Sequence, residues 1–95
     1  MKALTVVAKV VAKKDAVESL KTQLQKLVEL TRQESGCIEY RLHQDNTDPA
    51  VFLFFENWDS ASSLEQHMCS AHFKAYVETS TGLIAEKQVY LMSEV

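Results

Sequence analysis

The first third of the chain shows two different hydrophobic periods. From residue 4 to residue 12 apolar residues alternate, and several are valines, which predicts a strand with at least one buried face. From residue 17 to residue 31 apolar positions recur every three or four residues, which predicts a helix with one apolar stripe. Asp15 is a candidate N-cap or first-turn carboxylate for this helix, and Gly36 is its candidate stop.

The middle of the chain predicts a hairpin. Residues 38–43 alternate between apolar and polar, and residues 44–50 are rich in Asp, Asn and Pro, which favours a turn. Residues 51–55 are apolar on both faces and lead into Glu56, Asn57 and Trp58. This strand is the most buried of the chain, so we expect it in the centre of the sheet.

The last third predicts a broken helical segment and a final strand. Asp59 or Ser60 can cap a helix after residue 60, Ser70 can cap a second short helix, and residues 89–92 alternate as a strand. The element order is β-α-β-β-α-β, that of an α+β ferredoxin-like fold whose antiparallel sheet carries its helices on one face. We expect one domain over residues 1–95.

The second face of this sheet is too apolar to remain in contact with water. On the central strand Val51, Leu53 and Phe55 stand opposite the inward set that includes Phe52 and Phe54. Packing the sheets of two copies against each other would bury this excess. The pattern therefore predicts a homodimer.

Composition and charge exclude several kinds of partner. The formal net charge is −3 and the ten Lys and Arg residues are scattered, which argues against nucleic acid and against an anionic membrane surface. No run approaches the roughly 18 apolar residues of a membrane-spanning helix, and the alternating start does not resemble a signal peptide. Cys37 and Cys69 lack CxxC spacing, so we expect free thiols in the cytoplasm.

Glu56 and Trp58 share one face of the predicted central strand, among aromatic residues. A carboxylate on an apolar face is costly unless it is paired. Either Glu56 forms a rim ion pair with Arg41, or it orients a histidine in a cleft. Trp58 either packs in the core or aims its N–H into a pocket that accepts a flat aromatic ligand.

His67 is the candidate general base. It stands on the helix that should cross above Trp58, although it is equally interpretable as a half-buried helix residue. His67 and His72 would lie about 140° apart on a continuous helix and could not chelate a metal unless the helix breaks at Ser70. We therefore expect no metal ligands, with His72 as a capping or packing residue and His43 exposed.

The stretch from Gly36 to Tyr76 resembles the antibiotic biosynthesis monooxygenase family, whose members include quinol monooxygenases. The residues that carry the resemblance are Gly36, Cys37, Tyr40, Leu42, Asp45, Phe52, Glu56, Trp58, Leu64, His67, Ser70, His72, Phe73 and Tyr76. The resemblance implies a dimeric α/β barrel. It also implies oxidation of quinols or electron-rich aromatics by O₂ without flavin, haem or metal.

In the chemistry implied by this resemblance, the substrate is itself the reductant. A base removes a proton, the anion passes an electron to O₂, the caged radicals recombine, and the peroxide collapses to a quinone and water. By position His67 would be the base, with Trp58 and Asn57 as possible hydrogen-bond donors and Phe54 and Tyr76 as walls. Asn57 points to the opposite face from Trp58, so only one of the two can line a given cleft.

Other reactions of related proteins fit less well. Haem-degrading relatives carry an Asn on the first strand, which is absent here, and a phosphorylated substrate would have only Arg41 on an internal strand to bind it. The leading hypothesis is a cofactor-independent monooxygenase acting on a hydroquinone-like or polyphenolic molecule. The alternatives are an isomerase of a small oxygenated metabolite and a non-catalytic small-molecule-binding or stress-response dimer.

Overall fold

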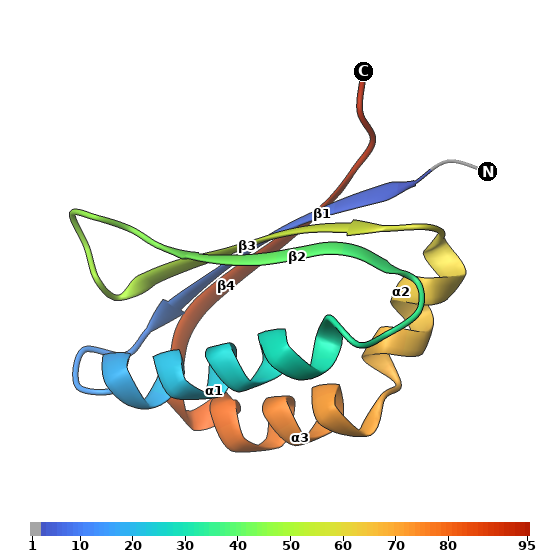
Figure 1. Cartoon of the computed structure of the whole chain (residues 1–95). Helices are drawn as coiled ribbons and strands as arrows, with labels where there is room; N and C mark the ends of the chain where they lie inside the picture. The colour runs from blue at the N-terminus through green and yellow to red at the C-terminus, as the bar shows by residue number, and fades with distance from the viewer. Residues whose placement is uncertain (1–2) are drawn as a thin grey trace.

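A computed structural model of the chain describes residues 3–95 (Figure 1). The elements follow the predicted order, with one additional 3₁₀ turn before the last strand. They are β1 (Leu4–Ala12), α1 (Val17–Thr31), β2 (Cys37–Gln44), β3 (Val51–Trp58), α2 (Ala61–Met68), α3 (Ala71–Ser80), η1 (Thr81–Leu83) and β4 (Ile84–Met92).

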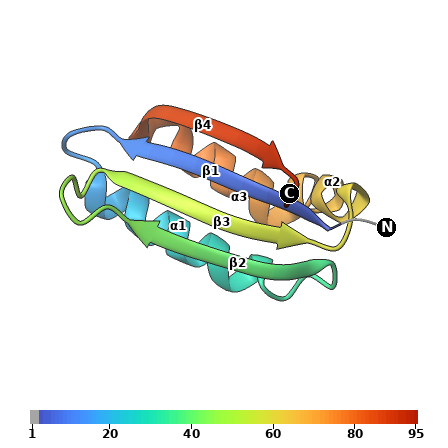
Figure 2. The same cartoon turned by 90° about the horizontal axis from the view of Figure 1, so that it is seen from above.

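The four strands form one antiparallel sheet in the order β2-β3-β1-β4. The helices all lie on one face of it, so that the view from above shows the strands in front of them (Figures 1 and 2). The predicted ferredoxin-like βαββαβ fold and the central position of β3 are confirmed. The last strand is longer than predicted because its polar first half also pairs with β1, through Lys87 opposite Val10 and Glu86 opposite Val11.

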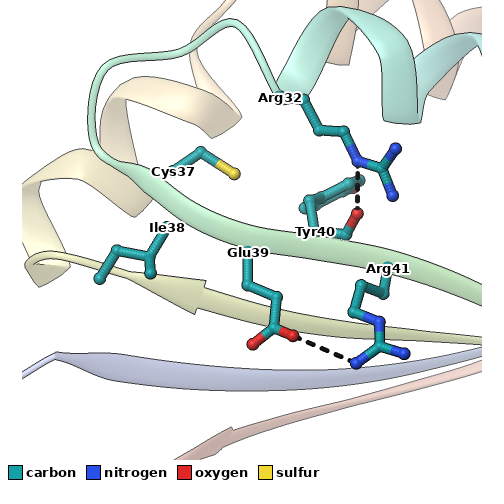
Figure 3. Close-up of a pocket in the computed structure, with 6 residues that line it drawn as sticks. All are labelled: Arg32, Cys37, Ile38, Glu39, Tyr40 and Arg41. Carbon is teal, nitrogen blue, oxygen red and sulfur yellow. Dashed lines mark hydrogen bonds and ion pairs between the residues drawn. The ribbon is translucent and has the colours of Figure 1, made fainter.

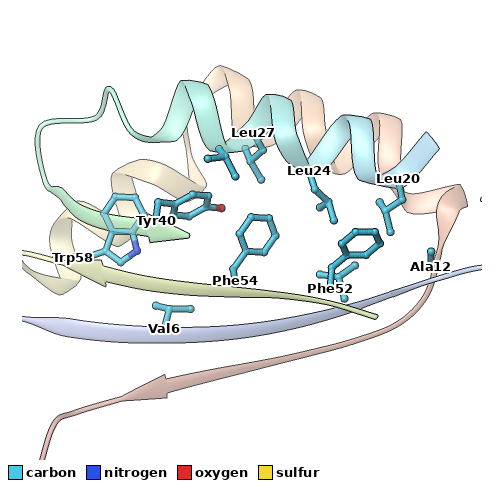
Figure 4. Packing of buried hydrophobic residues seen from close by; sticks show 11 residues of the cluster. Val6, Ala12, Leu20, Leu24, Leu27, Tyr40, Phe52, Phe54 and Trp58 are labelled. Atoms are coloured by element: carbon cyan, nitrogen blue, oxygen red, sulfur yellow. The ribbon is translucent and has the colours of Figure 1, made fainter. Parts of the chain in front are cut away.

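The core lies between the sheet and α1. The apolar stripe of α1 faces the inward residues of β3, and Tyr40 and Phe54 pack between them with ring centroids 5.1 Å apart (Figure 4). Burying a large apolar side chain contributes about 1.5–3 kcal/mol, so these contacts dominate the stability of the chain. The residues of this core are Val6, Val10, Ala12, Leu20, Leu24, Leu27, Val28, Tyr40, Phe52, Phe54 and Trp58.

The start of α1 differs from the prediction. The N-cap is Ala16, without a side-chain hydrogen bond, so the expected roles of Asp15 were wrong. The chain enters the helix through a backbone turn, in which the Ala16 N–H donates to the Lys13 carbonyl at 2.9 Å and the Leu20 N–H donates to the Ala16 carbonyl. A turn closed by the backbone needs no capping side chain.

Gly36 is not the helix stop that was predicted. Helix α1 already ends at Thr31, and the chain leaves it through tight turns in which the Glu34 N–H donates to the Thr31 carbonyl at 3.0 Å. Gly36 has no positive φ, but a Cβ at this position would overlap the Ser63 hydroxyl at the start of α2. Glycine is required here for a close approach between segments.

The two predicted serine caps are confirmed. Ser60 accepts a hydrogen bond from the Ser63 N–H at 3.2 Å, and Ser70 accepts one from the Phe73 N–H at 3.3 Å. The second cap begins a new helix directly after Cys69, which is the C-cap of α2. The helical segment is therefore broken at the expected place, which reorients everything that follows Ser70.

Within residues 3–95, no helix covers the other face of the sheet (Figure 1). Its central positions include Val7, Leu53 and Phe55, which are half-buried, and Tyr90, whose exposed fraction is 48%. Burial of this face by a second copy stays a prediction. None of the helices in the described part of the chain is long and apolar enough to cross a membrane.

Candidate active site

Glu56 and Trp58 form a hydrogen-bonded pair inside the protein. The alternation of β3 turns both side chains toward the helices, where Glu56 is 5% exposed and Trp58 is fully buried. The indole Nε1–H donates to Glu56 Oε1 at 2.9 Å. Burial raises the pKa of Glu56 to about 7, although the indole hydrogen bond acts in the opposite direction.

The predicted ion pair between Glu56 and Arg41 was wrong. Strand register sets Tyr40 opposite Glu56, and Arg41 opposite Phe55, so the guanidinium and the Glu56 carboxylate lie on opposite faces. Arg41 instead donates to Glu39 at 3.3 Å. The carboxylate that faces the core is satisfied by its own strand.

His67 lies directly against this pair. It is the last-turn residue of α2 that turns inward, its exposed fraction is 2%, and its ring centroid lies 4.8 Å from that of Trp58. Tyr40 and Phe73 complete the surroundings, with centroids 5.7 and 4.9 Å from the imidazole. The expected crossing of this helix above Trp58 is confirmed.

Glu34 connects the two histidines, and it is the residue that the sequence did not reveal. Its Oε2 lies 2.7 Å from His67 Nδ1 and 2.7 Å from His72 Nε2. Glu34 belongs to the turns between α1 and β2, outside any periodic pattern. The available signal was a carboxylate two residues before Gly36. Its role as a histidine partner becomes evident only when α2 and α3 lie beside it.

The contact with Glu34 determines what His67 can do. A carboxylate only accepts hydrogen bonds, so His67 Nδ1 carries a proton and the lone pair of Nε2 is free. Burial lowers the pKa of His67, against the opposing effects of the Glu34 hydrogen bond and charge. Burial thus favours the neutral imidazole, the form in which it can take a proton.

The remaining candidate residues fall into two groups. Phe54 packs against Tyr40 in the core, and Tyr76 of α3 lies beside Phe73 with ring centroids 5.8 Å apart. Asn57, like Arg41, is on the opposite face of the sheet from His67. There the Thr5 hydroxyl donates to Asn57 Oδ1 at 2.6 Å, and Asn57 Nδ2 donates to Glu39 at 2.8 Å.

Two surface depressions lie near the residues that surround His67. The larger, about 370 Å³, follows β2 at the edge of the sheet, where Arg32 Nε donates to the Tyr40 carbonyl at 3.0 Å (Figure 3). The smaller, about 150 Å³, lies between α1 and α3, and His72 and Tyr76 contribute to its wall. Tyr40 and His72 each line one depression, and their ring centroids lie 5.7 and 6.0 Å from that of His67.

The model of the antibiotic biosynthesis monooxygenase family matches residues 3–79 of the chain. The chain belongs to this family. A relative from Synechocystis, the uncharacterized protein sll1783, is 33% identical over 94 residues, which cover 96% of this chain. This chain spans only 64% of the length of that relative.

Two further proteins are similar to this chain, one in sequence and one in structure. The Escherichia coli protein named "Probable quinol monooxygenase YgiN" is 28% identical over 78 residues, covering 74% of this chain and 75% of that protein. The crystal structure of PA3566 from Pseudomonas aeruginosa, 29% identical, matches with a TM-score of 0.96 over 100% of this chain and 96% of that one. The family and the first of these names are consistent with a monooxygenase.

Proposed function

We propose that this protein is a cofactor-independent monooxygenase that oxidises a hydroquinone-like or polyphenolic molecule with O₂. The observation that carries the proposal is the Glu34–His67 pair, in which Nδ1 of the imidazole lies 2.7 Å from a carboxylate oxygen while the ring packs among aromatic side chains. Family membership and a relative named a quinol monooxygenase support the reaction type. The proposed compartment is the cytoplasm, where Cys37 and Cys69 would remain free thiols.

In the proposed reaction His67 Nε2 takes the proton of a phenolic hydroxyl. The resulting anion gives one electron to O₂, and recombination of the two radicals forms a carbon–oxygen bond and a peroxide. The O–O bond then breaks, so that one oxygen stays as the quinone carbonyl and the other leaves as water. The aromatic surroundings exclude water from the radical pair, and the buried position of His67 supports this role.

The other candidate residues take more modest roles. The N–H of Trp58 is engaged by Glu56, so we assign Trp58 to packing against the imidazole rather than to binding the substrate oxygen. Phe54 and Tyr76 would serve as walls. Asn57 and Arg41 could reach a substrate only from the open face, through an interface between two copies.

A homodimer is part of the proposal. The open face presents half-buried Val7, Leu53 and Phe55 beside Tyr90 of β4, a continuous apolar strip that one copy leaves uncovered. Two such faces packed together would form the expected α/β barrel and remove the strip from water. Light scattering should give twice the mass of one chain.

Oxygen uptake by metal-stripped protein with a panel of hydroquinones and phenols tests the function. We expect uptake that chelators do not affect, and a fall of at least about 100-fold in His67→Ala and His67→Gln, because general bases typically contribute that much. The matched control is His43→Ala, which removes an exposed histidine of β2. Unchanged turnover in folded His67 variants would overturn the assignment of His67 as base.

The burial of His67 also favours one second candidate, a non-catalytic binder of aromatic molecules. An imidazole that is 2% exposed meets a substrate only if the cluster opens. Such a binder would change the fluorescence of Trp58 on adding a phenol without consuming O₂. Ligand-dependent fluorescence with no uptake across the panel would select this candidate.

A further inference from the structure

Three side chains from three segments converge at the junction of α2 and α3. Glu34, His67 and His72 each offer one ligand atom, and these atoms all lie within 4.8 Å of one another. On a continuous helix the two imidazoles would point about 140° apart. The break at Ser70 instead brings their ring centroids to 6.0 Å, and both aim a nitrogen at the same carboxylate oxygen.

We propose that this cluster binds a transition-metal dication such as zinc. The protein ligands would be Glu34 Oε2, His67 Nδ1 and His72 Nε2, with water in a fourth position. Two imidazole nitrogens and one carboxylate oxygen are the donor set of zinc sites that keep an open coordination position. The sequence argument against metal ligands applied only to a helix continuous through Ser70, and the break at Ser70 removes that argument.

Zinc binding requires the three ligand atoms to shift. Zinc–ligand bonds of about 2.0–2.1 Å in a tetrahedron separate the ligand atoms by about 3.3 Å, so each 2.7 Å contact would open by roughly 0.6 Å. The two imidazole nitrogens, which lie within 4.8 Å of each other, would approach by up to about 1.5 Å. Glu34 can supply the first of these movements because it stands in a turn with its side chain 18% exposed. The His72 side chain is 20% exposed, against 3% for His67, so the cation and its water would enter from the Glu34 and His72 side.

Metal binding would also change the protonation of His67, a consequence that rests on the proposed function. Without metal, the carboxylate holds a proton on His67 Nδ1 and leaves Nε2 free. With metal on Nδ1, the neutral ring carries its proton on Nε2, which can then no longer accept one from the substrate. Zinc would therefore inhibit the oxidation by occupying the base.

Calorimetric titration of the metal-stripped protein with zinc sulfate tests the site without any substrate. We expect one zinc per chain with micromolar or tighter affinity. In His72→Ala we expect binding to weaken more than about 100-fold, because even outer-shell partners of a metal are worth 10- to 100-fold. His43→Ala, the matched histidine control, should bind as the wild type does.

Cobalt(II) provides a second measurement, because replacing a histidine with a merely structural role would leave the cobalt spectrum unchanged. The wild type should give the intense visible bands of four-coordinate cobalt, and both His72→Ala and Glu34→Gln should lose them. Circular dichroism of each variant verifies the fold. Absence of zinc binding, equal affinity in folded His72→Ala, or only the weak spectrum of octahedral cobalt would overturn the proposal.

The two proposals fail in different ways. Zinc binding without oxygen uptake on any substrate would leave the metal site standing and remove the proposed monooxygenase function. Oxygen uptake without zinc binding would do the reverse. If zinc binds with the expected ligands but uptake continues unchanged, the inhibitory role is wrong, and recovery of uptake on adding a chelator is the result that supports it.

Discussion

The two faces of β3 carry similar residues in opposite surroundings. Toward the helices the strand presents two phenylalanines, a glutamate and a tryptophan, all 5% exposed or less. Toward the open side it presents two aliphatic residues, a phenylalanine and an asparagine, all of them half-buried. The inward glutamate is tied to an indole within its own strand, whereas the outward asparagine is tied to both neighbouring strands. One face is thus complete within a single chain, and the other remains uncovered by it.

The largest expected difference in stability between the two faces comes from truncating one phenylalanine on each face. Phe52→Ala should cost about 3–5 kcal/mol of unfolding free energy, because Phe52 is 1% exposed and its removal leaves a cavity. Phe55→Ala, the matched change on the open face, should cost less than half as much in a dilute monomer. Urea unfolding measures both.

Repeating the unfolding experiment at several protein concentrations tests whether the open face is covered by a second copy. If two copies pack through the open face, the loss in Phe55→Ala should depend on protein concentration, because association contributes to stability by mass action. The loss in Phe52→Ala should contain a large part that concentration does not alter. Equal, concentration-independent losses in the two variants would mean that the faces do not differ as described.

The next largest effect concerns the buried carboxyl. Burial raises the pKa of Glu56 from 4.5 to about 7, so the folded chain holds this proton more tightly than the unfolded chain does. The stabilisation is fully present below pH 4.5 and is lost as the pH rises through about 7. Glu56→Gln cannot ionise, so its stability relative to the wild type should grow by about 2–3 kcal/mol between pH 5 and 8.

Unfolding in urea at several pH values measures this difference. Glu65→Gln is the control, because it makes the same substitution at an exposed carboxylate of α2. A Glu56→Gln profile parallel to that of the wild type would show that Glu56 ionises alike in the folded and unfolded chains.

The smallest effect should come from the polar network of the open face. Asn57→Ala removes its hydrogen bonds to Thr5 and Glu39, which are only partly shielded from water, and should cost about 1 kcal/mol. His43→Ala, at an exposed position on the same face, should change stability by less than about 0.5 kcal/mol. Thermal unfolding of the two variants side by side makes the comparison, and a larger loss in His43→Ala would contradict it.

Most of the fold could be predicted because local chemistry and tertiary packing agree. The alternation of β3 fixed which side chains face the helices, and Ser60 and Ser70 marked two helix starts that the structure confirms. The prediction failed where the backbone performs the task without a side chain. Ala16 caps α1 in place of Asp15 because a backbone turn leads into the helix.

The candidate site was less predictable because it depends on register and on distant segments. The one-residue offset that sets Tyr40 opposite Glu56 moves Arg41 to the other face, and no periodic pattern reveals such an offset. Glu34 lies in a turn without hydrophobic periodicity, so its role in the site is evident only from the histidines that contact it. His67 and Trp58 could be paired because both belong to regular elements.

The Glu34 contacts also bear on how the folded chain opens. They join positions 33 and 38 residues apart in the chain, so neither can form before the α2 and α3 segment has docked beside the end of α1. The strands, in contrast, are held by their own ladder of backbone hydrogen bonds. A local opening of α2 and α3 would separate His67 from its carboxylate while the sheet stays intact. The pairing of His67 with Glu34, on which the proposed general base depends, would thus be lost under milder denaturing conditions than the sheet.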